Sequence, residues 1–331
     1  MDFSLIICTY LRPQPLLRLL NSVKTQTLYP NEILIIDGST NNETEHILNV
    51  NKFKNLKYFK VDHNHRGLTK QRNFGIQKTS NESEIICFLD DDTVLENDYF
   101  KQLLNTYQIY PNALGVGGYI TNEVVWTKSE KQTSKKTYFY DGFERNEPLR
   151  YRWRRCFGLQ PNTPPCMLPK FSHGRSVSFL PPSGKVYKVE QFMGGVSSFK
   201  KVVFDQISFS TYFEGYGLYE DADFTLRLSK LGELYVNTSA RLSHYHDTSG
   251  RPNKFKYGKM VARNGWYVWR VKHPHPGLKN RLKWNFTIIL LMKLRFLNVV
   301  THPNKIEALT EGFGRFVGWL SLIFNKPTIQ R

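Results

Sequence analysis

The sequence has no run of about 18 consecutive apolar residues, the length that a membrane-spanning helix needs. It has only four cysteines, and the spacing of Cys8, Cys87, Cys156 and Cys166 matches no metal-ligand pattern. The N-terminus opens with Asp2 and a strand-like apolar run, not with the basic and then apolar regions of an export signal. These absences predict a cytoplasmic protein with free thiols.

Acidic residues are scarce in the C-terminal quarter. Residues 251–331 contain 16 Lys and Arg but only two acids, Glu307 and Glu311, within a chain of formal charge +18. Two aromatic, apolar segments with basic flanks lie at 283–300 and 312–324. Helices of this kind bind at the surface of anionic membranes, so we expect a peripheral protein on the cytoplasmic membrane face. The alternative is that these helices pack on the rest of the chain or form a homodimer. No nucleic-acid partner is expected, because no nucleic-acid-binding motif accompanies the charge.

The first part of the chain alternates between apolar, β-branched runs and segments with helical spacing. Strands are predicted at residues 3–9, 32–37, 56–62 and 84–90, and a helix at 68–79. Strands that alternate with helices of this length form a parallel sheet with helices on both faces. We therefore expect an α/β fold with a mostly parallel sheet, which binds ligands at the carboxyl ends of its strands.

Polar residues end the predicted strands on their carboxyl sides: Thr9, Asp37, Asp62 and Asp90. Asp90 is also the first of three consecutive aspartates, Asp90–Asp92, with no basic residue in the surrounding stretch 85–98 to neutralise them. An acidic turn explains such a cluster, because Asp favours turns. Clustered carboxylates also suit Mg²⁺, which is commonly held by one or two carboxylates together with substrate phosphates.

Six motifs occur along the chain in the order of a known family: SLIICTYLRP, ILIIDGST, NHRGLTKQRNFGI, FLDDD, FMGGVSSFKK and GYGLYEDADFTLRLSKLG. In these motifs the sequence resembles glycosyltransferase family 2, over roughly residues 3–250. The resemblance implies an inverting enzyme with the glycosyltransferase A fold, whose nucleotide-binding sheet is mostly parallel. It is specific for the superfamily and says little about which sugar is transferred.

The resemblance also predicts the organisation of the chain. Residues 1–250 are expected to form the catalytic domain. Its parts are a nucleotide-sugar-binding half at 1–120, an irregular insertion at 121–190 and an acceptor and catalytic part at 191–250. The remaining residues, 251–331, are expected to form a basic, amphipathic and helical C-terminal region.

The resemblance assigns the donor nucleotide to the loops after the first strands. It implies that Asp37 accepts a hydrogen bond from the imide N–H of the base of a UDP-, dTDP- or GDP-linked sugar. Thr9, Tyr10 and Arg12 then line the same pocket. Each residue also has an ordinary explanation, because an Asp before Gly38 initiates turns and an aromatic residue after a strand often only packs.

The segment GLTKQRN matches a second element of the family on the donor side. The resemblance implies that Gly67, Arg72 and Asn73 bind the substrate. The planar fork of an arginine suits a diphosphate, because it gives paired and always charged donors. The alternative for Arg72 is a solvated position on a helix, like that of Lys70 and Lys78.

The aspartate triple and a histidine pair are the implied metal ligands. The resemblance places Asp92 on the metal and Asp90 near the metal or the donor ribose, and Asp91 is expected to contact the substrate. His244 or His246 adds a further ligand, and their spacing does not choose between them, because alternate residues of a strand point to the same side. Mg²⁺ or Mn²⁺ is expected, since imidazole suits the softer Mn²⁺ better.

Acidic residues at a predicted helix start carry the implied catalysis. The resemblance makes Asp221 the base that deprotonates the acceptor hydroxyl, with Glu220 binding the acceptor. Gly194 and Gly195 place backbone near the donor sugar. Acids at this position also favour the positive end of a helix dipole, which is compatible with a catalytic role.

The leading hypothesis is a metal-dependent transfer of a hexose from a nucleotide diphosphate sugar to a saccharide or lipid-linked acceptor. A sugar-phosphate nucleotidyltransferase is the enzymatic alternative, but the segment CTYLRPQP lacks the Gly-rich basic loop that such an enzyme carries after its first strand. The remaining alternative is a non-catalytic, membrane-associated scaffold that keeps the fold.

Overall fold

The computed structural model describes residues 1–246, 252–300 and 304–330, which fold into two compact units. The sheet unit comprises Met1–Trp126 and Ser176–Gly250, and the helical unit comprises Thr127–Arg175 and Arg251–Arg331. The insertion thus shares a unit with the C-terminal quarter. The predicted boundary at residue 250 separates the residues expected to take part in catalysis from the C-terminal region. This boundary stays a prediction about function.

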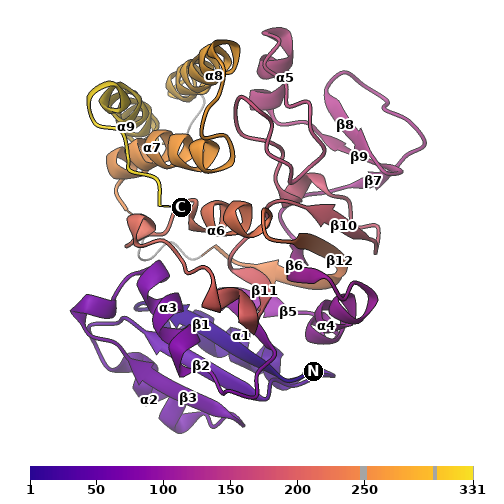
Figure 1. Ribbon diagram of the computed structural model, residues 1–331, viewed down its shortest axis with the longest axis vertical. Coiled ribbons are helices and arrows are strands. Elements are labelled where there is room, and N and C mark those ends of the chain that lie inside the picture. Colours follow the sequence, from indigo (N-terminus) through magenta and orange to yellow (C-terminus); the bar gives the residue numbers. More distant parts are fainter. Residues whose placement is uncertain (247–251, 301–303, 331) are drawn as a thin grey trace. The chain divides into compact units, whose positions relative to one another are not determined.

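The sheet unit is an α/β fold, as predicted (Figure 1). Its strands are β1 Phe3–Thr9, β2 Glu32–Asp37, β3 Leu56–Lys60, β4 Ile85–Asp90, β5 Thr93–Leu95, β6 Ala113–Ile120, β10 Val186–Val189, β11 Val196–Lys200 and β12 Glu233–His244. Its α-helices are α1 Pro13–Lys24, α2 Glu43–Val50, α3 Leu68–Lys78, α4 Tyr99–Ile109 and α6 Glu220–Leu228.

The strands form one mixed sheet of order β10-β12-β6-β11-β4-β1-β2-β3, with β5 beside β12. The four strands predicted from the N-terminal pattern, β3-β2-β1-β4, are parallel throughout. β11 runs antiparallel between β4 and β6, whereas β6 and β12 are parallel. Thr9 lies opposite Asp37 and Cys8 opposite Asp90, so the carboxyl ends of β1, β2 and β4 meet at one edge. This edge holds the candidate site.

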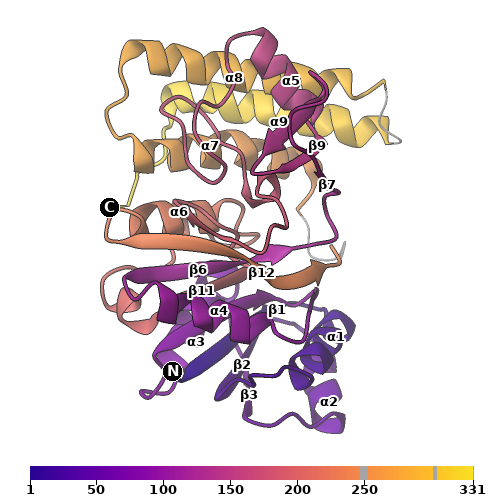
Figure 2. The same ribbon diagram turned by 90° about the vertical axis from the view of Figure 1, so that its right-hand side faces the viewer.

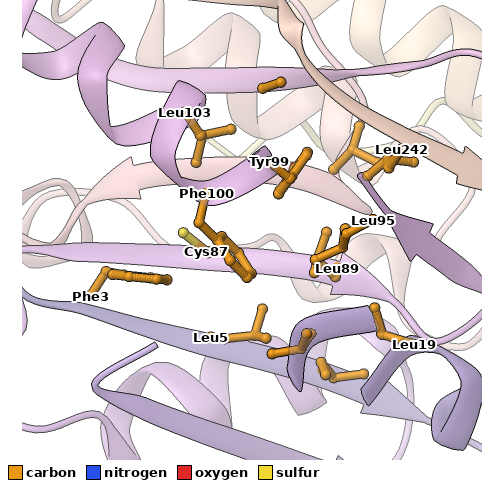
Figure 3. Close-up of a cluster of buried hydrophobic side chains, with 14 of the residues drawn as sticks. Phe3, Leu5, Leu19, Cys87, Leu89, Leu95, Tyr99, Phe100, Leu103 and Leu242 are labelled. Carbon is orange, nitrogen blue, oxygen red and sulfur yellow. The ribbon is translucent and has the colours of Figure 1, made fainter. Parts of the chain in front are cut away.

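Alternate residues of the central strands pack against helices on opposite faces. Leu5 on β1 and Cys87 and Leu89 on β4 belong to the core that α1 and α4 cover, which Figure 3 shows together with Phe3 and Phe100. On the other face, Ile6 and Ile36 lie against α3 at Gly75, where an added Cβ would stand 2.8 Å from Ile6. Helices therefore cover both faces, as the alternating pattern predicts.

Stacked phenylalanines fix helix α6 on this second face. Phe224 of α6 stacks on Phe209 with ring centroids 4.3 Å apart and meets the edge of Phe199 on β11 at 4.9 Å. Phe88 on β4 meets the edge of Phe209 at 5.5 Å. Phe199, Phe209 and Phe224 are almost fully buried. This packing holds the N-terminal turn of α6, and so Asp221, beside the carboxyl ends of the strands.

The helical unit contains a small antiparallel sheet, one short helix and three long helices (Figure 2). Its elements are β7 Thr127–Lys128, β8 Thr137–Tyr140, β9 Phe143–Asn146, α5 Leu149–Cys156, α7 Lys254–Lys272, α8 Leu278–Leu297 and α9 Lys305–Phe324. The C-terminal quarter is helical, as predicted. The expectation of a wholly irregular insertion was wrong, because β7, β9 and β8 pair within it.

Helix α9 packs on α7 through glycines. Added Cβ atoms at Gly314 and Gly318 would collide with backbone oxygens of Phe255 and Lys259 on α7, and one at Gly258 would collide with the backbone of Glu311. Figure 2 shows α9 between α7 and α8. One side of the predicted interfacial helix is therefore a packing surface.

Among the described residues, no helix is long and apolar enough to cross a membrane. The four cysteines are free thiols, as predicted.

Candidate active site

Asp91, the middle aspartate of the triple, is tied to the loop after β1. It accepts hydrogen bonds from Thr9 Oγ1 at 2.7 Å and from Arg12 at 3.1 Å, one on each carboxylate oxygen. Burial raises the pKa of Asp91 to about 7, against the opposing effect of Arg12 and Thr9. Thr9, Arg12 and Asp91 thus form a buried support for the loop, and their contact with substrate stays a prediction.

Asp90 and Asp92 flank this support and meet His244, the last residue of β12. The Nε2 atom of His244 lies 2.9 Å from Asp92 Oδ1. One ligand atom from each of Asp90, Asp92 and His244 lies within 4.8 Å of the others. Two carboxylates and an imidazole form a donor set that suits Mn²⁺ or Mg²⁺. The residues therefore fit the metal that the family resemblance implies, and His244 is the histidine that lies with the aspartates.

His246 lies in a second group, with His244 and Glu123. Its Nε2 atom is 3.0 Å from Glu123 Oε1, and the same oxygen is 3.4 Å from His244 Nδ1. The centroids of the two imidazole rings lie 4.1 Å apart, although β12 ends at His244 and His246 lies beyond the strand. The structure thus places His246 with Glu123 and away from the aspartate group, so direct ligation by His246 is the less favoured of the two.

Arg72 is a buried counterion and lies beneath the surface of the site. Its guanidinium is paired with Glu220 at 2.5 Å and lies 3.7 Å from Asp90. The rings of Phe88 and Phe209 pack against it, with its Cζ atom 5.5 and 5.1 Å from their centroids. The side chain is only 3% exposed, so the alternative explanation, a solvated position on a helix, does not hold. A direct contact between Arg72 and a diphosphate stays a prediction.

Asp221 lies in the first turn of α6. Its Oδ1 accepts the backbone N–H of Ala222 at 2.7 Å, and its Oδ2 accepts that of Gly194 at 3.3 Å. Burial raises the pKa of Asp221 above its ordinary value, against the opposing effect of these two hydrogen bonds. Tyr219, just before the helix, has φ +71°, a rare conformation for a residue with a side chain. Such backbone strain clusters at functional sites.

Gly194 and Gly195 connect the metal group to the proposed base. An added Cβ at Gly195 would overlap the carboxylate of Asp90, and one at Gly194 would lie against Glu220 and Arg72. Both glycines are therefore required by the side chains of the site itself. Their predicted closeness to the donor sugar stays a prediction.

Asp37, the residue predicted to bind the nucleobase of the donor, is fully buried at the end of β2. Its carboxylate accepts hydrogen bonds from the backbone N–H of Ser39 at 2.8 Å and from the hydroxyl of Tyr58 at 2.9 Å. These hydrogen bonds hold the turn that follows β2. They agree with the alternative explanation of Asp37 as a residue that initiates a turn. Tyr10 lies nearby in the chain and is 36% exposed, so its ring is available for stacking.

The remaining donor-side residues hold backbone in place. Asn73 exchanges hydrogen bonds of 2.8 and 3.0 Å with the backbone O and N of Phe209. Gly67 has φ +116°, and an added Cβ would lie 2.8 Å from the nitrogen of Gly215. Both residues therefore anchor neighbouring loops, and substrate contact by either stays a prediction.

Comparison with known proteins finds a family match in the first half of the chain. Residues 4–162 match the family described as Glycosyl transferase family 2. The chain carries a glycosyltransferase family 2 domain. The O-antigen chain rhamnosyltransferase RfbN of Salmonella typhimurium is 32% identical over 108 residues, which are 31% of this chain and 32% of the relative. The glucosyl-dolichyl phosphate glucuronosyltransferase of Haloferax volcanii is 29% identical over 135 residues, or 39% of this chain and 42% of the relative. The matches thus span a third to two fifths of each relative's length.

Two residues of the family 2 domain were missed by reading the sequence. Glu123 follows β6, and its neighbour Asn122 exchanges two hydrogen bonds of 2.9 Å with the backbone of His244. An acidic residue just past a strand is a signal of the kind that identified Asp90. This signal identifies Glu123 as a neighbour of His244 only once β6 is known to pair with β12, about 120 residues further along the chain.

Proposed function

We propose that the protein is an inverting, metal-dependent glycosyltransferase that moves a hexose from a nucleotide diphosphate sugar to an acceptor hydroxyl. The observation that carries the proposal is the short connection between two functional groups. Gly195 lies against Asp90 of the metal group, and its neighbour Gly194 donates a hydrogen bond to Asp221. This connection supports an arrangement in which a metal-bound diphosphate and a carboxylate base would lie on either side of one sugar.

Asp90, Asp92 and His244 would hold the metal, which supplies charge stabilisation for the departing nucleoside diphosphate. The acceptor oxygen attacks the anomeric carbon and forms the new glycosidic bond, while the bond from that carbon to the diphosphate oxygen breaks. The acceptor proton passes to Asp221. A base is more effective when its pKa approaches the working pH, so the raised pKa of Asp221 favours this role.

In the proposed mechanism, the ion pair of Arg72 and Glu220 holds the neighbouring site residues in position. Arg72 supplies a fixed positive charge beside Glu220 and Asp90. Glu220 precedes the base on the same helical turn, so the ion pair also fixes the direction in which Asp221 faces. The pair thereby positions the catalytic base and, through Asp90, the metal group, and a contact between Arg72 and the donor diphosphate remains part of the proposal.

The donor pocket of the proposal lies beside β1 and β2. Tyr10 supplies a ring on which the nucleobase of the donor can stack. Asp37 fixes the turn against which this nucleobase rests. UDP-, dTDP- and GDP-linked sugars are the candidate donors. The relatives are named for rhamnosyl and glucuronosyl transfer, onto an O-antigen chain and a glucosyl-dolichyl phosphate. The acceptor proposed here is accordingly a saccharide or a lipid-linked saccharide.

Attachment to an anionic membrane is a second component of the proposal. The C-terminal quarter combines its excess of basic residues with large apolar side chains in contact with water. Phe286, Phe313 and Phe324 are 59%, 55% and 86% exposed. Such surfaces bind the boundary between lipid head groups and acyl chains, which would bring a lipid-linked acceptor to the enzyme.

A panel of nucleotide sugars tests the transferase proposal. Thermal unfolding is measured with each nucleotide sugar, with and without Mn²⁺ or Mg²⁺, for the wild type and for Asp92→Asn. One donor should raise the melting temperature only when metal is present, and the variant should lose this rise while keeping its own melting temperature. Stabilisation by every donor without metal, in both proteins, would contradict the proposal. Release of pyrophosphate from a nucleoside triphosphate and a sugar phosphate would favour a nucleotidyltransferase instead.

A further inference from the structure

The helical unit contains a cavity of about 340 Å³ between α7, α8 and α9. Four of its ten lining residues are tryptophans: Trp266 and Trp269 come from α7, Trp284 from α8 and Trp319 from α9. This volume lies at the lower end of the range for small-molecule sites, about 300–1,000 Å³. All of the lining residues belong to the helical unit, so this cavity is distinct from the site in the sheet unit.

Two of the four tryptophans stack on each other, and two use their indole N–H groups in hydrogen bonds within the protein. Trp269 and Trp284 stack with ring centroids 5.5 Å apart. The indole N–H of Trp269 donates to the backbone oxygen of Lys170 at 3.0 Å, and that of Trp319 donates to Asn285 Oδ1 at 2.9 Å. A wall of this kind can pack against apolar surface, such as a hydrocarbon chain.

Two arginines at the same cavity have no acidic partner among the described residues. Arg270 lies over the rings of Trp266 and Trp269, and its Nε atom is buried without a hydrogen-bond partner. Arg281 donates its Nε–H to the backbone oxygen of Pro276 at 2.8 Å, which leaves its other N–H groups for a ligand. Burial and the nearby charge of Arg281 lower the pKa of Arg270.

Among the described residues of the C-terminal quarter, no acidic side chain is paired with these arginines. The only two acids of this quarter are Glu307 and Glu311. Glu307 lies 3.3 Å from Lys254, and Glu311 is paired with Arg295 at 2.7 Å and with Arg315 at 2.6 Å. Two neighbouring guanidinium groups without a carboxylate are an anion site, and their fork geometry suits phosphate.

The lining of the cavity includes the exposed side chains of Ile323 and Lys326. Ile323 of α9 lines the cavity and is 60% exposed, and its neighbour Phe324 is 86% exposed. An apolar rim next to paired cations matches a molecule with a phosphate group at one end and a hydrocarbon chain at the other. A free sugar phosphate would leave this rim in water.

We propose that the cavity between α7, α8 and α9 binds the phosphate of a lipid, with Arg270 and Arg281 on the phosphate and the tryptophan wall on the first part of the hydrocarbon chain. The proposal does not depend on sugar transfer, because its residues lie outside the sheet unit. It also differs from attachment to a charged surface, since it predicts a saturable site for one molecule.

The test uses the full-length protein and dodecyl phosphate below its micelle concentration, followed by tryptophan fluorescence. Four of the six tryptophans line the cavity, so binding should change the emission and saturate at one molecule per chain. Arg270→Gln and Arg281→Gln should each weaken binding about tenfold or more, as expected for loss of a charged hydrogen-bond partner. Lys279→Gln, an exposed charge on α8 outside the cavity, should bind within about twofold of the wild type.

Three ligands keep the test decisive if an arginine variant fails to fold. Dodecyl maltoside should not compete with dodecyl phosphate, and inorganic phosphate should compete only weakly. Equal binding of the maltoside would show an apolar slot without an anion site and would overturn the proposal. Competition by inorganic phosphate as strong as that by dodecyl phosphate would show a free-phosphate site and would overturn the lipid assignment. Unchanged binding in folded Arg270→Gln and Arg281→Gln would do the same.

Discussion

The Nε2 atom of His244 lies 2.9 Å from Oδ1 of Asp92, while its other ring nitrogen, Nδ1, lies 3.4 Å from Oε1 of Glu123. The imidazole therefore bridges the proposed metal group and a carboxylate behind it. A metal-binding histidine typically uses its second nitrogen in this way, which fixes the orientation of the ring and strengthens it as a ligand.

The first prediction concerns this carboxylate. Glu123→Gln should weaken Mn²⁺ binding by about 10–100-fold, the usual effect of losing such a partner, while the melting temperature changes little. Calorimetric titration of the protein with Mn²⁺ measures the effect directly. Glu130→Gln, which changes an exposed glutamate outside the group, is the matched control. Equal affinities in the two variants would remove Glu123 from the metal site.

The second prediction concerns pH. Burial alone would lower the pKa of His244, but its contacts with Asp92 and Glu123 raise it to about 10. The metal-free histidine is therefore protonated at neutral pH, and a metal must displace this proton. Apparent Mn²⁺ affinity should rise about tenfold per pH unit between pH 6 and 8, with about one proton released per ion. Titration in buffers of different ionisation enthalpy counts the proton. A pH-independent affinity would show that His244 does not ligate.

The third prediction concerns Gly195. Gly195→Ala should displace the carboxylate of Asp90, because the added Cβ occupies its position. Metal-dependent nucleotide binding should then fall at least tenfold. Gly277→Ala is the matched control, since an added Cβ there meets nothing within 4 Å. If the two variants bind nucleotide with equal affinity and metal dependence, Asp90 is not part of the site.

The fourth prediction concerns the membrane. The protein should sediment with vesicles containing anionic lipid and be released as salt rises, because salt screens exposed charges. Phe313→Ser should reduce the fraction that resists salt, since it removes an apolar side chain that is 55% exposed. Ile109→Ser, which changes a similarly exposed side chain of the sheet unit, should leave binding unchanged. Protein that ignores anionic vesicles at low salt would contradict the proposed attachment.

The sequence predicted the parallel part of the sheet well, because its strands are continuous apolar runs. The predicted strands at 3–9 and 32–37 coincide with β1 and β2. Asp90 and Asp92 were predicted to bind a metal together with His244 or His246, and the structure brings His244 to the two aspartates. Each of the three consecutive aspartates after β4 lies beside a basic side chain from elsewhere in the chain: Asp90 beside Arg72, Asp91 beside Arg12 and Asp92 beside His244. These contacts explain how three negative charges can follow one strand.

Other features were missed for identifiable reasons. The partners of Asp91 lie about 80 residues away in the chain, so no local pattern reveals them. The hairpin of β8 and β9 did have a local signal. Asp141 and Gly142, between the two strands, have φ +47° and +79°, and Asp-Gly is a strong marker of a two-residue hairpin turn. The surrounding charges and prolines obscured it, and the segment was read as irregular.

Asp221→Asn tests the central claim most directly. The measurement is metal-dependent release of nucleoside diphosphate from the donor identified by the panel, with the acceptor or water as nucleophile. The variant should bind the donor with wild-type affinity and metal dependence, because Asp221 is not a ligand of the metal group. Its turnover should fall about 10²–10⁴-fold, the usual contribution of a positioned base. Asp205→Asn, at an exposed position on the same unit, should remain fully active. Turnover of Asp221→Asn near the wild-type rate would contradict the account.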